Sequence, residues 1–222
     1  MSNTTRSFKA DTWQSAILSL LSTYRVMHSY FTNSNALNEF LQSHDEIMAT
    51  AVASELETAK EVYSQQMVVT ANSYIELILK DFLVALFRKF PERMHDFLFA
   101  SGQGLKGFVS LTEIVESGSL DILLDNLSER AASNVMVGKF KTCLINLDKL
   151  AKETIPQELK DKLVPIVEQR NRIVHEASKE KALDAELVLE SCWSLVTYLD
   201  AVASKQGIPS DNIFLMSISP TL

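Results

Sequence analysis

The stretch SELETAKEVYSQQMVVTANSYIELILKDFLVALFRKF, residues 54–90, decides the fold. It contains neither glycine nor proline, so no residue in it is a strong helix breaker. Its apolar side chains recur at helical intervals and trace one predicted inner stripe, made of Leu56, Tyr63, Met67, Tyr74, Leu77, Ile78 and Phe87. The pattern predicts a long amphipathic helix, and Pro91 either stops it or starts the next one.

The start of this helix is signalled twice. SHDE at 43–46 and SELE at 54–57 each place a glutamate three residues after a serine. This is the spacing of a capping box, in which the serine and glutamate side chains bond each other's backbone N–H groups. The two signals predict helix starts at Ser43 and Ser54.

Helical patterns also occupy most of the remaining chain. The expected helices cover 11–32, a short segment around Leu37, Phe40 and Leu41, and then 91–101, 108–116, 120–153, 155–177 and the segment from the predicted cap Asp184 to Val202. Gly138 is expected to interrupt the 120–153 pattern, and Pro165 predicts a kink or a restart at 163–165. The last helix has an apolar face made of Val188, Cys192, Leu195, Val196, Leu199 and Val202.

Composition supports an all-α fold. Apolar residues make up 46% of the chain and charged residues 22%, and six glycines and five prolines are too few for the many turns of an all-β protein. We expect one helical domain spanning 1–222, with a core of roughly 50–205, an inserted helical segment at 101–140 and a short apolar, β-prone C-terminal tail. The formal net charge is −7, so any contact with phosphate must come from a local cationic patch.

The two cysteines, Cys143 and Cys192, lie in apolar helical patterns. They match neither a zinc spacing nor a disulfide framework, so we expect buried thiols in a reducing compartment. The N-terminus lacks the apolar segment of a secretory signal, and no apolar run approaches the ~18 residues of a membrane span. These features predict a cytoplasmic protein without a membrane partner.

The stretch VEQRNRIVHEASK, residues 167–179, carries the candidate chemistry. Cleaving an RNA backbone without metal requires a base, an acid and a cation for the phosphorane charge. The imidazole of His175 suits the first two roles and the guanidinium of Arg170 suits the third. The two residues are five positions apart, about 140° around a regular helix. Both therefore reach one substrate only if the helix frays or ends near His175, or if a second subunit supplies part of the site.

This stretch resembles the signature of the HEPN superfamily. In its ribonucleases an arginine is followed by Asn, Asp or His and, a few residues on, by a histidine; here the sequence is Arg170-Asn171-Arg172-Ile173-Val174-His175. ANSYIELILKDFL, 71–83, is similar to the family's long helix, whose glutamate points at the site. The resemblance covers roughly 50–205 and implies a metal-independent endoribonuclease with a composite site in a homodimer. Its members often act as toxins or in phage defence, with an antitoxin or a defence-system protein as partner.

The resemblance also implies roles for individual residues. His175 is the expected base or acid, Arg170 holds the scissile phosphate, and Asn171 positions one of them. Glu76 has a supporting role and Arg172 contacts the RNA. Neither a metal nor a cofactor is expected.

Plainer interpretations stand beside these roles. Arg170 and Arg172 are also typical of exposed helix charges paired with Glu168 or Glu176. His175 could cap the C-terminal end of its helix, where the dipole favours a cation. Glu76 could be a surface residue facing Lys80 at i+4.

A second loose match, Arg88 with His95, has Lys89 where the family has a polar residue, and we interpret it as a decoy. The cationic run Arg88, Lys89 and Arg93 could hold RNA backbone or simply end a helix. The alternative function is a non-catalytic helical dimer that binds RNA, a nucleotide or a partner protein, and a third is a structural adaptor that docks through residues 213–218.

Overall fold

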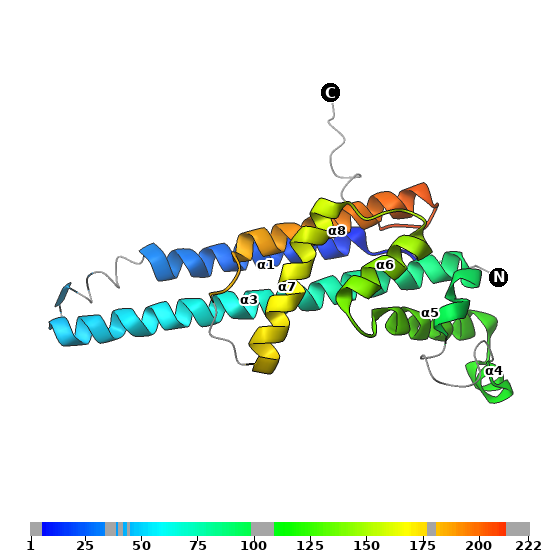
Figure 1. Cartoon of the computed structure of the whole chain (residues 1–222), viewed down its shortest axis with the longest axis horizontal. Coiled ribbons are helices and arrows are strands. Elements are labelled where there is room, and N and C mark those ends of the chain that lie inside the picture. Colours follow the sequence, from blue (N-terminus) through cyan, green and yellow to red (C-terminus); the bar gives the residue numbers. More distant parts are fainter. Residues whose placement is uncertain are drawn as a thin grey trace, which may run out of the picture.

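The structure is a computed structural model and describes residues 6–33, 39, 42–43, 45–98, 109–176 and 181–211. Within these residues the chain is all-α, which confirms the predicted fold class. Figure 1 shows the eight helices of this part: α1 (Ala10–Asn33), α3 (Glu46–Lys89), the 3₁₀ helix η1 (Pro91–Phe97), α4 (Leu111–Ser117), α5 (Leu120–Met136), α6 (Phe140–Ala151), α7 (Gln157–Glu176) and α8 (Ala185–Lys205). The short helix expected around Leu37, Phe40 and Leu41 lies outside the described residues.

The long helix α3 begins between the two predicted starts. Its N-cap is Asp45, whose side chain accepts a hydrogen bond of 2.9 Å from the backbone N–H of Met48. Ser54 lies inside the helix, so the predicted starts at Ser43 and Ser54 are wrong. A serine–glutamate pair at this spacing also fits a helix interior, where tertiary context outweighs the local signal. The end is as predicted, because Pro91 begins η1.

The core lies around the C-terminal half of α3. Residues 82–87 are all buried, so α3 is enclosed on every side there. Figure 1 shows α8 along one side of α3 and α5 along the other. The predicted apolar face of α8 is buried throughout, which confirms it. Of the predicted α3 stripe, Leu77 is an error, because 49% of its surface is exposed.

The segment from α4 to α6 shares this core. Gly138, with a φ of 100°, separates α5 from α6, as predicted. The buried side chains of α5, including Leu127 and Val135, belong to the same hydrophobic cluster as those of α3 and α8. Burial against α3 therefore holds the described part of the predicted 101–140 insertion on the body of the molecule.

Helix α7 positions the candidate motif. It continues through Pro165 as one helix, so the predicted restart does not occur. In Figure 1 it starts beside α8, crosses α3 and ends beyond α3. Its buried face includes Leu163 and Ile166, so burial of this face fixes which side chains project outward.

The first and last described segments of the chain meet beside α1. The backbone N–H of Phe8 donates to the Pro209 carbonyl at 2.8 Å, and that of Asp211 donates to the Phe8 carbonyl at 3.1 Å. These bonds form an isolated parallel bridge between Phe8 and Ser210. The docking strand predicted at 213–218 lies outside the described residues.

One described helix, α8, is long and apolar enough to cross a membrane, with a mean hydropathy of 1.2 over its most apolar window. The sequence-based prediction concerned uninterrupted apolar runs, and α8 contains Glu186, Glu190 and Asp200. Half of that window is buried inside the protein, which is typical of a core helix in a globular domain.

Candidate functional site

A cleft of about 1050 Å³ lies between α3, the α5–α6 connection and α7. We call it the first cleft. Each of the three elements contributes cationic and apolar side chains to it. Helices α3 and α7 each add one carboxylate. The lining residues are Ser73, Glu76, Leu77, Lys80, Ser133, Met136, Gly138, Lys139, Phe140, Lys141, Val164, Val167, Glu168, Arg170 and Asn171.

Three predicted site residues line this cleft together. Arg170 and Asn171 enter it from α7, and Glu76 enters it from α3. The Arg170 Nη1 group donates a hydrogen bond of 3.0 Å to the Asn171 Oδ1 atom. The structure therefore places Asn171 where it orients the guanidinium, and Arg170 where it faces the cleft.

His175 lies next to Arg170 but outside the lining of the cleft. Its Nε2 atom is 3.5 Å from Arg170 Nη1. The helix ends at Glu176, one residue later, and the two groups meet within one chain despite their angular separation. Arginine has only donors, so a hydrogen bond here requires a neutral ring whose Nε2 accepts. In that tautomer the Nε2 lone pair points at Arg170, so it can take a substrate proton only after Arg170 turns from it to the phosphate.

Glu76 is fixed by a residue that the sequence reasoning missed. Asn72, one helical turn earlier on α3, is 1% exposed and donates from Nδ2 to Glu76 Oε1 at 2.9 Å. Glu76 is exposed and lines the same cleft as Lys80, which is compatible with the plainer interpretation of a surface residue facing Lys80. The signal was present in the sequence as an Asn–Glu pair at i,i+4.

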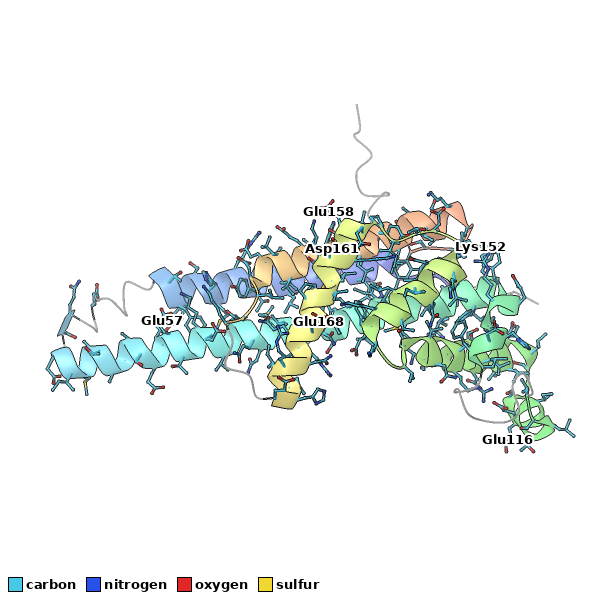
Figure 2. All side chains as sticks on the ribbon, in the orientation of Figure 1. Glu57, Glu116, Lys152, Glu158, Asp161 and Glu168 are labelled. Atoms are coloured by element: carbon cyan, nitrogen blue, oxygen red, sulfur yellow. The ribbon has the colours of Figure 1, made fainter. Side chains whose placement is uncertain are left out.

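The cations Lys80, Lys139 and Lys141 were also missed. Lys139 and Lys141 flank the start of α6, and Gly138 turns the chain so that both reach the cleft. Lys141 Nζ lies 3.3 Å from Glu168 Oε1, an ion pair in which both side chains are more than half exposed. Glu168 lies on α7 in Figure 2. Only the three-dimensional arrangement of three helices brings these charges together.

Arg172, predicted to contact RNA, does not line the first cleft. It is partly buried on α7. The plainer interpretation paired Arg170 with Glu168. In the described structure Arg170 bonds Asn171 instead, and Glu168 forms an ion pair with Lys141.

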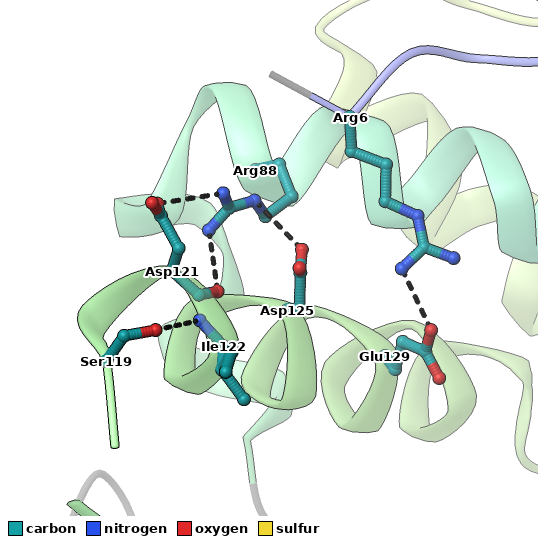
Figure 3. Close-up of polar contacts among 7 residues, drawn as sticks. All are labelled: Arg6, Arg88, Ser119, Asp121, Ile122, Asp125 and Glu129. Atoms are coloured by element: carbon teal, nitrogen blue, oxygen red, sulfur yellow. Dashed lines mark hydrogen bonds and ion pairs between the residues drawn. The ribbon is translucent and has the colours of Figure 1, made fainter. Parts of the chain in front are cut away.

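Two members of the cationic run that starts at the end of α3, Arg88 and Arg93, have structural partners. Figure 3 shows Arg88 between Asp121 and Asp125 of α5, with ion-pair distances of 3.3 and 3.1 Å. The Arg88 side chain is only 7% exposed. These contacts give Arg88, the arginine of the Arg88–His95 decoy, a structural role in joining α3 to α5.

Arg93 is likewise engaged inside the fold. Its Nη1 group donates to the Leu150 carbonyl at 2.8 Å and to Gln206 Oε1 at 2.7 Å, and its guanidinium carbon lies 3.8 Å from the centre of the Phe90 ring. Burial lowers the pKa of Arg93 from its usual value. These contacts oppose the interpretation that the run holds RNA, because Arg88 and Arg93 already have partners.

Comparison with protein-family models, curated protein sequences and solved structures finds no match to this chain. The HEPN resemblance therefore rests on the 170–175 motif and the helical pattern around it.

Proposed function

We propose that the chain is a metal-independent endoribonuclease of HEPN type that acts on RNA at the first cleft. The observation that carries the proposal is the 3.5 Å approach of Arg170 to His175 at a cleft with three further cations. The protein as a whole is acidic, with a net charge of −7, so this cluster is a local exception. Such a patch is what phosphate recognition requires in an acidic chain.

Each motif residue has a role that fits its contacts. His175 Nε2 takes the proton of the 2′-OH, and that oxygen attacks the adjacent phosphorus. Arg170 donates to the non-bridging oxygens, where negative charge builds up in the transition state. Asn171 holds the guanidinium in place through the 3.0 Å bond. Glu76 supports the site from the opposite wall. The expected products are a 2′,3′-cyclic phosphate and a 5′-hydroxyl.

A homodimer completes this chemistry. The reaction needs a proton acceptor for the 2′-OH and a proton donor for the leaving 5′-oxygen, and no histidine lines the first cleft in the described part of the chain. A second His175 from a partner copy across a two-fold axis supplies the missing group. By resemblance, the enzyme serves as a toxin or a phage-defence component, restrained by an antitoxin or a defence-system protein.

RNA cleavage in EDTA tests the proposal. Wild-type protein cleaves single-stranded RNA, and His175→Ala lowers the rate by about 100-fold or more, the usual contribution of general acid–base catalysis. His95→Ala is the matched control, because His95 is exposed and its described partner is Asp96, far from the cleft. Cleavage that persists in His175→Ala would refute the mechanism.

A second function has one observation in its favour. The first cleft is lined by Arg170 and Asn171 but not by His175, an arrangement that also suits a module that binds RNA or a nucleotide without cutting it. Tight RNA binding without cleavage by the wild-type protein would select this alternative.

A further inference from the structure

A second cleft, of about 500 Å³, continues the first one along α7. It lies between α6 and the N-terminal half of α7. Lys141 and Val164 line both clefts, so the two are joined at these residues. We call the joined clefts the α7 groove.

The α7 groove is long enough for several nucleotides. It extends along α7 from Asn171 to Gln157, which is about 21 Å at the rise of an α-helix. Stacked nucleotides of one strand are spaced by about 3.4 Å, so the groove is much longer than one nucleotide. It is also open along its length, because its two parts are surface clefts between helices.

The walls of the groove alternate in chemistry. Phe140 gives the first cleft an aromatic side chain, and Ile145 and Pro165 give the second cleft exposed apolar ones. Lys141 lies between them. Its pairing with Glu168 is a surface ion pair worth little energy, so its ammonium group is free to bind a phosphate instead. Apolar platforms for bases with cations for the backbone are typical of surfaces that bind single-stranded nucleic acid.

We propose that the α7 groove binds single-stranded RNA over several consecutive nucleotides. Lys141 contacts the phosphate between the two clefts, and Ile145 and Pro165 contact a base in the second cleft. Lys160, although it lines the second cleft, is held by Asp148 and does not take part. The inference rests on the proposed function and adds to it the path and minimum length of the RNA.

Fluorescence anisotropy with uncleavable probes tests the inference. The probes are fluorescein-labelled oligoadenylates with 2′-O-methyl riboses, one a dinucleotide and the other a hexanucleotide. Wild-type protein binds the hexanucleotide about tenfold more tightly or better. Ile145→Glu, which places a carboxylate in the second cleft, weakens hexanucleotide binding to the level of the dinucleotide and leaves dinucleotide binding unchanged. Lys141→Gln lowers the slope of log affinity against log salt by about 0.7, the value for one phosphate contact with a single strand.

Val26→Glu is the matched control, because Val26 is an exposed apolar residue of α1. It leaves the binding of both probes unchanged, and circular dichroism shows that all variants are folded. Equal binding of the two probes, or equal hexanucleotide binding by Ile145→Glu and Val26→Glu, overturns the inference and leaves the proposed function standing. Failure of wild-type protein to bind either probe contradicts both.

Discussion

At the scale of single residues, Gln169 joins the motif helix to the rest of the fold. It is 4% exposed and stands directly before Arg170. Its Nε2 group donates to the Lys181 carbonyl at 2.9 Å, and its Oε1 atom accepts from the Leu183 N–H at 2.8 Å. One amide therefore satisfies two backbone groups of the segment that leads into α8 and fixes the rotation of α7.

Replacing Gln169 should lower the free energy of unfolding, because its side chain amide pairs two backbone groups. Gln169→Ala leaves the Lys181 carbonyl and the Leu183 N–H without partners, so we expect the free energy of unfolding to fall by about 2 kcal/mol. Gln157→Ala is the control, because Gln157 is exposed and bonds only its neighbour Asp161 in the described structure; its cost should stay below about 0.5 kcal/mol. Urea denaturation measures both free energies of unfolding. Equal decreases in the two variants would contradict a stabilising role for the hydrogen bonds from Gln169 to Lys181 and Leu183.

The two thiols should be unreactive in the folded protein. Burial raises the pKa of Cys143 and of Cys192 from 9.0 to about 12, with nearby Glu76 adding to the shift of Cys143. At about pH 8 both remain protonated thiols, which are poor nucleophiles. We therefore expect almost no reaction with Ellman's reagent in native buffer and reaction of both thiols after denaturation.

The same shift makes stability depend on pH. The unfolded thiols ionise near pH 9 and the folded ones only near pH 12, so their contribution to the free energy of unfolding is complete below pH 9 and is lost as the pH rises towards 12.

Thr142→Cys, which places a thiol at an exposed position, is the reactive control for the labelling experiment with Ellman's reagent. Rapid native labelling of the wild-type protein would show that these cysteines are not buried.

At the scale of secondary structure elements, α5 is held against α3 by ion pairs as well as by its apolar face. Arg88 of α3 reaches Asp121 and Asp125, and Figure 3 shows a second pair, at 2.9 Å, that joins Glu129 of α5 to Arg6 in the segment before α1. The Arg88 side chain is nearly buried, whereas its two carboxylate partners are about half exposed. Losing the cation therefore costs less than breaking a fully buried pair.

Arg88→Ala should lower the free energy of unfolding by about 1–2 kcal/mol and leave the rate of RNA cleavage unchanged. Lys89→Ala, at the exposed neighbouring position, should change neither. Thermal unfolding and the EDTA cleavage assay measure the two effects. A large loss of cleavage in folded Arg88→Ala would indicate instead that the cationic run Arg88, Lys89 and Arg93 contacts RNA.

The sequence predicted the presence of most helices, but not the residue at which the long helix α3 begins. It also pointed to Glu76, Arg170 and Asn171, but not to the other side chains that line the first cleft with them. The core face of α8 and the break at Gly138 follow from periodicity and from backbone chemistry, which are local properties. The predicted helix start at Ser54 is wrong because tertiary packing can extend a helix through a sequence that would otherwise cap it. Lys80, Lys139 and Lys141 could not be found, because their proximity depends on how α3, α6 and α7 cross.

At the scale of the whole molecule, an acidic chain concentrates cations in one cleft. Two carboxylates in that cleft, Glu76 and Glu168, reduce its positive charge, and the formal net charge of the whole chain is −7. If RNA binds at the first cleft as proposed, we expect its affinity to depend on contacts inside the cleft rather than on long-range steering.

Activity should depend on assembly. If each chain of the proposed homodimer contributes one His175 to the site, the cleavage rate per chain should fall when the protein is diluted below the dissociation constant of that dimer. Sedimentation at the same concentrations should show the dimer giving way to single chains. A rate per chain that stays constant while the dimer dissociates would show that one copy is sufficient.

Whether Arg170 and His175 together break a phosphodiester can be decided from the chemistry of the RNA ends. Wild-type protein is incubated in EDTA with an RNA that carries a single 2′-deoxy substitution, and the products are identified by mass spectrometry. We predict 2′,3′-cyclic phosphate and 5′-hydroxyl ends at every cut, no cut on the 3′ side of the deoxy position, and loss of all products in His175→Ala. Cuts that leave 5′-phosphate ends, or cleavage after the 2′-deoxy nucleotide, would contradict this account.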